Sequence, residues 1–60
     1  MLVLSRKRFQ SVVITHPLLA DPIIVEVEKI NGNQVVLGFT ANERVQILRK
    51  ELTERKETDD

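Results

Sequence analysis

The clearest pattern in the chain is an alternation of apolar and polar residues between Ile23 and Arg49. The first run, Ile23–Glu28, puts apolar residues on one face of a strand and glutamates on much of the other. A second run over 34–39 and a third over 44–49 repeat the alternation, with short polar segments between the runs. This pattern predicts a three-stranded antiparallel meander.

The first reversal of this meander contains Asn31-Gly32-Asn33, residue types that tolerate positive φ. The sequence leaves open whether Asn31-Gly32 or Gly32-Asn33 occupies the two central turn positions. Thr40–Glu43 is polar and short enough to form the second reversal.

The segments before the meander are predicted to form two further strands, a turn and a loop. Leu2–Lys7 is a strand candidate with apolar residues on both faces, Arg8–Gln10 a turn, and Ser11–Ile14 a short strand. The segment Thr15–Pro22 contains two prolines, which exclude a regular ladder, and it is predicted to be a loop. Its Leu18-Leu19 pair is either tucked against the sheet or exposed as a contact surface.

The C-terminal part predicts a short helix from Lys50 to Lys56, in which Leu52 is the one apolar anchor. Residues 57–60 are acidic and are expected to be disordered. We therefore divide the chain into a domain over 1–52, followed by the end of the helix and an acidic tail over 53–60.

Length limits the stability of any fold, because the core of a sixty-residue chain supplies roughly 3–5 kcal/mol at best. The chain has no cysteine for disulfides or thiolate metal sites, so oligomerisation is the usual remaining means of stabilisation. It also lacks a signal-peptide pattern and an apolar run near the ~20 residues of a membrane span. These features predict a soluble, cytoplasmic protein with no membrane partner.

The net charge is zero, but the charges are segregated. Residues 1–13 carry +3 and residues 43–50 carry +2, whereas 14–42 carry −2 and 51–60 carry −3. In both basic segments two alternate apolar positions precede an arginine: Leu2, Leu4, Arg6 and Val45, Ile47, Arg49. Each arginine could lie at the edge of the sheet, with its aliphatic part packed on apolar neighbours and its guanidinium in solvent. Alternatively, its guanidinium could bind a phosphate or the edge of a base.

The residues offer no enzymatic chemistry. His16 is the single histidine, and it lies in the loop. Glu26 and Glu28 have the spacing of a solvated strand face, and Gly32 and Gly38 do not form a phosphate-binding loop. We expect no catalytic activity, no metal site and no cofactor.

Three stretches together resemble the carbon storage regulator (CsrA/RsmA) family: residues 1–7, residues 32–35 followed by 37–38, and residues 45–52. The resemblance implies a mostly β fold, a small antiparallel β-barrel or sandwich with a short C-terminal α-helix. It further implies an interlocked, strand-swapped homodimer, in which the first and last strands of one subunit insert beside the middle strands of the other. Such a dimer would have a larger hydrophobic core than one chain can form alone. It would also bring the two basic segments together.

The resemblance also implies a function, namely RNA-binding regulation of translation in bacteria. The expected ligand is a GGA-containing single strand or hairpin loop in an mRNA leader, where binding occludes the ribosome-binding site or alters mRNA stability. The residues implied in RNA binding are Leu4, Ser5, Arg6, Lys7, Ile47, Leu48, Arg49 and Glu51.

Several positions depart from the family pattern and indicate a divergent member. Phe9-Gln10 replaces the usual Gly-Glu pair, so the turn there must be built differently, and the 15–22 loop is longer than usual. Val36, Asn42 and Leu48 stand where a basic residue, a proline and a histidine are common.

Two other functions remain open from the sequence. The dimer could act mainly as a protein-interaction module through Leu18-Leu19 or the C-terminal helix, or it could bind DNA. Besides mRNA, the candidate partners are an antagonist small RNA and a regulatory protein.

Overall fold

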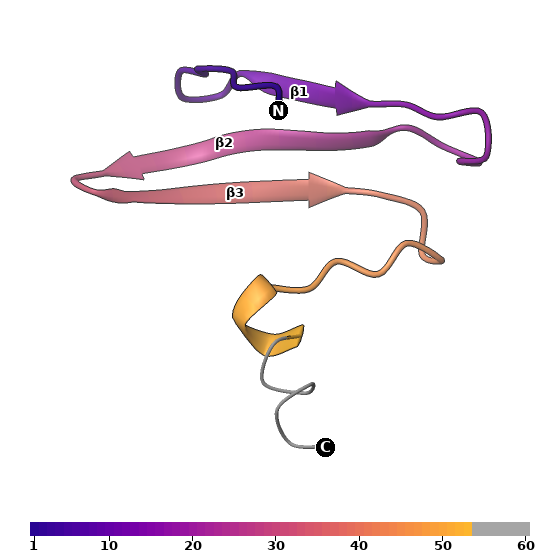
Figure 1. Cartoon of the computed structure of the whole chain (residues 1–60). Coiled ribbons are helices and arrows are strands. Elements are labelled where there is room, and N and C mark those ends of the chain that lie inside the picture. Colours follow the sequence, from indigo (N-terminus) through magenta and orange to yellow (C-terminus); the bar gives the residue numbers. More distant parts are fainter. Residues whose placement is uncertain (54–60) are drawn as a thin grey trace.

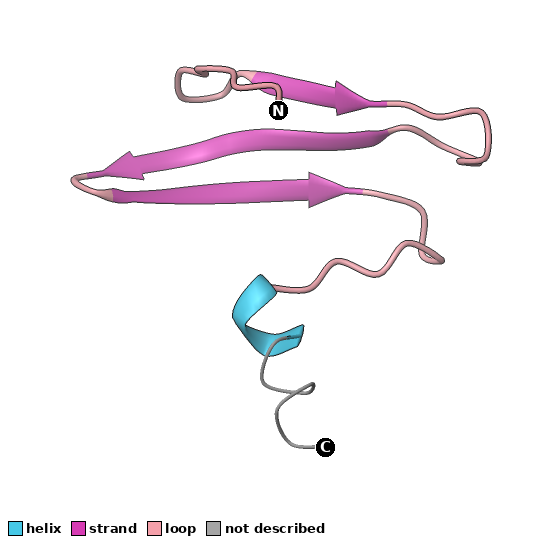
Figure 2. Ribbon diagram, viewed as in Figure 1, coloured by secondary structure: helices cyan, strands magenta, loops and turns pink. Residues whose placement is uncertain are grey.

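The chain forms one antiparallel sheet in a computed structural model that describes residues 1–53. The strands are β1 (Ser11–Ile14), β2 (Ile23–Asn31) and β3 (Gln34–Thr40), in the order β1-β2-β3 (Figure 1). A helical turn over residues 50–53 follows (Figure 2). The expected mostly β fold with a short C-terminal helix is confirmed. The predicted continuation of the helix to Lys56 and the acidic tail lie outside the described residues.

The β2–β3 hairpin resolves the open question of the first reversal. Asn31 pairs with Gln34, so Gly32-Asn33 occupies the two central positions. Gly32 has φ +61°, whereas Asn33 is not among the residues with positive φ. This pattern is that of a type II′ turn, whose twist matches that of the flanking strands.

A β-bulge interrupts the hairpin at Glu28. Val27 pairs with Leu37 and Lys29 pairs with Val36, which leaves Glu28 as the extra residue on β2. Beyond the bulge the alternation of faces is reset, and Ile30 lies on the same face as Val27. Without the bulge, Ile30 would share the face of the glutamates.

The register gives the sheet one apolar and one largely polar face. The apolar face consists of Val12, Ile14, Ile23, Val25, Val27, Ile30, Val35, Leu37 and Phe39. Among the described residues Val27 is the one buried apolar side chain, at 8% exposed. Most of the apolar face therefore remains accessible in the single chain.

The predicted third strand of the meander, Arg44–Arg49, does not form, and Leu2–Lys7 is not a strand either. Asn42 accounts for the first difference: its Oδ1 accepts a hydrogen bond from the Arg44 amide at 2.9 Å, and its carbonyl accepts one from the Val45 amide at 2.9 Å. This turn directs the chain away from the edge of β3 (Figure 1). A strand needs a hydrogen-bonded neighbour, and neither segment has one within the described chain.

The 15–22 loop is tied to the turn that follows β3. Asn42 Nδ2 donates a hydrogen bond to Asp21 Oδ2 at 3.0 Å. The two leucines of the loop differ, because Leu19 is half-buried whereas Leu18 is 88% exposed. Leu19 is thus the partly tucked residue of the pair and Leu18 the exposed one, and a contact surface at Leu18 stays a prediction. No helix within residues 1–53 is long and apolar enough to cross a membrane.

Candidate nucleic-acid interface

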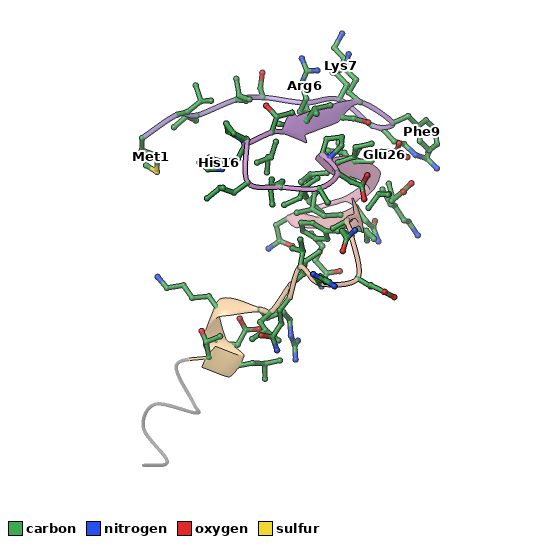
Figure 3. The ribbon with its side chains drawn as sticks, turned by 90° about the vertical axis from the view of Figure 1, so that its right-hand side faces the viewer. Met1, Arg6, Lys7, Phe9, His16 and Glu26 are labelled. Atoms are coloured by element: carbon green, nitrogen blue, oxygen red, sulfur yellow. The ribbon has the colours of Figure 1, made fainter. Side chains whose placement is uncertain are left out.

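The N-terminal half of the predicted site is an exposed segment that leads into β1. Leu4, Ser5, Arg6 and Lys7 are all exposed. Arg6 Nε donates a hydrogen bond to the carbonyl of Ser5 at 2.8 Å, and the Lys7 amide donates one to Gln10 Oε1 at 2.8 Å. Figure 3 shows the Arg6 and Lys7 side chains pointing away from the sheet. Both cations are therefore accessible to a polyanion.

A tight turn connects this segment to the sheet. The Gln10 amide donates to the Lys7 carbonyl at 3.0 Å, the Phe9 amide to the Val27 carbonyl at 2.6 Å, and the Val27 amide to the Gln10 carbonyl at 3.0 Å. Phe9 has φ +69° in this turn, a left-handed conformation that glycine adopts more readily. The sequence does not reveal this geometry, because nothing about phenylalanine indicates a positive φ.

The C-terminal half of the predicted site contains Ile47, Leu48, Arg49 and Glu51, which are all exposed. The carbonyl of Arg49 accepts a hydrogen bond from the Leu52 amide at 3.0 Å, which begins the helical turn. Arg49 Nε lies 3.5 Å from Glu51 Oε1, and the two side chains are 72% and 62% exposed. An ion pair this exposed contributes little free energy. A phosphate can therefore displace the Glu51 carboxylate from the Arg49 guanidinium.

The two halves lie at opposite edges of the sheet. Residues 4–7 precede the turn at the β1 edge, and residues 47–51 lie beyond β3 (Figure 1). One chain therefore does not bring Arg6 and Arg49 together. The expectation that they meet across two subunits stays a prediction.

A pair of carboxyl groups, those of Glu26 and Glu28, lies on the polar face of the sheet. Ser11 Oγ donates a hydrogen bond to Glu26 Oε1 at 3.4 Å. The pKa of Glu28 is raised above its ordinary value, first by the negative charge of Glu26, then by desolvation and by hydrogen bonding to the same residue. The sequence predicts that these two glutamates lie on a solvated strand face. The structure adds that they also interact with each other.

The sequence match to known proteins covers nearly the whole of this arrangement. The model of the CsrA global regulator protein family matches residues 1–58, which include every residue of the predicted site. The chain belongs to the CsrA family. The resemblance inferred from the residues is thereby confirmed.

Among curated CsrA family members, the chain is 40% identical over 55 residues to the translational regulator CsrA of Clostridioides difficile (strain 630), covering 92% of this chain and 71% of that protein. It is 43% identical over 54 residues to that of Thermosipho africanus (strain TCF52B), covering 90% and 67%. It is 45% identical over 58 residues to that of Brachyspira hyodysenteriae (strain ATCC 49526 / WA1), covering 97% and 65%. The chain thus spans about two thirds of the length of these CsrA relatives. No solved structure matches it.

Proposed function

We propose that the chain is a non-enzymatic, RNA-binding post-transcriptional regulator. It binds GGA-containing single strands or hairpin loops in mRNA leaders, and it represses translation by covering the ribosome-binding site or alters mRNA stability. The observation that carries this proposal is the family match over residues 1–58, together with relatives named translational regulators. The exposed basic residues of segments 4–7 and 47–51 support it.

The active form in this proposal is an interlocked homodimer. The accessible apolar face of the sheet supports it, because a second copy would cover this face and enlarge the core of a short chain. The unpaired segments 2–7 and 44–49 support strand exchange, since each would gain a ladder beside a strand of the partner. Exchange would put residues 4–7 of one subunit beside residues 47–51 of the other and create two equivalent sites.

Each site would combine charge with base recognition. Arg49, once released from Glu51, would bind a phosphate or the edge of a guanine through its planar guanidinium. Arg6 and Lys7 would contact the phosphate backbone of the RNA. Main-chain groups of the protein near Leu4 and Leu48 would hydrogen-bond to the edges of unpaired bases. Such a site needs local positive potential and no high net charge.

The proposal is tested by titrating the protein with a short RNA hairpin that carries GGA in its loop, beside a hairpin with a scrambled loop, at fixed salt. We expect selective binding of the first, with two hairpins per dimer. Arg49→Ala should weaken that binding by about 1–3 kcal/mol, because a bidentate contact is lost.

Arg44→Ala is the matched control. It removes the same charge from the same basic segment but outside the predicted site, so it should change the affinity much less. Equal binding of the two hairpins by the wild type would refute the function, whereas full affinity in Arg49→Ala would refute the site.

A further inference from the structure

Phe9 has an unusual position for a large apolar side chain. It is 63% exposed and does not contribute to the apolar face of the sheet. Within residues 1–53 it is also the one non-glycine residue with positive φ, at +69°. A glycine would adopt this backbone conformation without the steric cost that a Cβ imposes. The ring therefore serves neither core packing nor the backbone geometry of the turn.

The turn holds the phenylalanine in a defined place. The Phe9 amide donates a hydrogen bond to the Val27 carbonyl at 2.6 Å, and the following residue is bonded to the Lys7 carbonyl through its amide at 3.0 Å. These bonds anchor the backbone on both sides of the ring to β2 and to the N-terminal segment. Phe9 thus lies at the β1 edge of the sheet, beside the middle of β2, and its side chain is labelled in Figure 3.

Arg8 lies over one face of the Phe9 ring, so a ligand would stack on the opposite face. The Arg8 Cζ lies 4.5 Å from the centroid of the Phe9 ring, the distance of a cation–π contact. Its Nε donates a hydrogen bond to the Glu28 carbonyl at 3.2 Å, which fixes the guanidinium to the bulge of β2. We call this pair, Arg8 and Phe9, the stacking platform.

The surroundings of the stacking platform favour one class of ligand. Arg6 and Lys7 precede it directly, and no acidic residue occurs in residues 1–13. Glu28 adjoins Arg8 through its carbonyl, but its carboxyl group lies over Gly38 on β3. An exposed aromatic ring with a stacked guanidinium, next to further cations, is the combination that binds an unpaired nucleobase together with its phosphates. A protein partner would be expected to bury the ring within a wider apolar patch, but Arg6, Lys7 and Arg8 flank it in sequence.

We propose that an unpaired RNA base stacks on the stacking platform, next to the GGA element that the predicted site would bind. This inference rests on the proposed function and adds a contact to it. Because every base has a flat π face, the platform contributes affinity with little base preference. It lengthens the RNA that each site covers by one nucleotide.

The test compares wild type, Phe9→Gly and Phe9→Tyr on a GGA hairpin and on a scrambled hairpin, each with single-stranded flanks. Phe9→Gly should lose about 5- to 150-fold in affinity for both RNAs, the range for one stacked base, whereas Phe9→Tyr should stay close to wild type. The slope of log affinity against log salt should not change, because no charge is removed. Glycine relieves the strained φ, so the loss would not reflect misfolding, and urea unfolding of each variant checks this.

The stacked nucleotide is located with 2-aminopurine placed at successive flank positions. One position should show quenched fluorescence on binding to wild type and to Phe9→Tyr but not to Phe9→Gly. Equal affinity of all three proteins, or quenching that persists in Phe9→Gly, overturns the stacking platform. A wild type that binds both hairpins equally refutes the proposed function, yet the same variants still decide whether a base stacks on Phe9.

Discussion

At the scale of single residues, Glu26 and Glu28 show how a strand face can hold two like charges. The Glu28 carboxyl lies over Gly38, where an added Cβ would be only 2.7 Å from its Oε1. The missing side chain on β3 leaves room for both carboxyl groups on this face. Their proximity disfavours double ionisation, which is why the pKa of Glu28 is raised.

This pair predicts a pH-dependent stability. Because the pKa of Glu28 is higher in the folded chain than in the unfolded chain, ionisation destabilises the fold at neutral pH, and the penalty is lost as the pH falls through the folded pKa. Glu28→Gln should therefore raise the urea midpoint at pH 7 and have a smaller effect under acidic conditions. Unfolding curves at the two pH values measure this, and an equal difference at both would contradict the pair's role.

At the scale of elements, the β2–β3 hairpin is defined by its turn. Gly32 adopts φ +61° in open space, since a Cβ built there meets nothing within 4 Å. Position 32 therefore requires glycine because of its backbone conformation, and not because a side chain would meet a neighbour. The turn also sets the register that places Ile30 opposite Val35.

Gly32→Ala should lower the free energy of unfolding by about 1 kcal/mol, because alanine at this φ is strained. Asn33→Ala provides the control one position away, where φ is not positive. Chemical denaturation of both variants checks the expectation. A larger loss in Asn33→Ala would show that the turn depends on its second residue instead.

At the scale of the whole molecule, the sheet has one apolar and one largely polar face. Nine apolar residues share one face, and almost all of them remain partly or largely exposed in the single chain. A chain this short whose apolar face is uncovered buries too small a core to be more than marginally stable alone. The proposed homodimer would remove this surface from water.

Val35 and Val36 test which face is covered. The two neighbours on β3 are similarly exposed, at 55% and 50%, but point to opposite faces. Val35→Glu should raise the dimer dissociation constant by about 100-fold or more, since an unpaired carboxylate would be buried. Val36→Glu, opposite Lys29, should leave it nearly unchanged. Sedimentation measures both, and equal behaviour would place the interface elsewhere.

The sequence predicts the parts of this fold that depend on local pattern. The alternation from Ile23 predicts β2, the run ending at Phe39 predicts β3, and Asn31-Gly32-Asn33 predicts the hairpin between them. The family motifs also point to the correct family. These signals are local, because each depends on residues that are close in sequence.

Other features depend on partners distant in sequence and were not predicted. The run Arg44–Arg49 alternates as a strand does, yet the Asn42 turn leads it away from β3. Nothing near Glu28 marks the bulge, because the glutamates continue an apparently regular alternation. The positive φ of Phe9 follows from its bond to Val27, eighteen positions further along the chain.

The bulge at Glu28 has a consequence for how the chain tolerates a change in length. Val27 already pairs with Leu37 and Lys29 with Val36, so a chain without residue 28 would continue the ladder uninterrupted. Every remaining side chain of the hairpin would stay on its present face. Loss of codon 28 from this gene would therefore leave the side chains of the following strand residues on their present faces of the sheet.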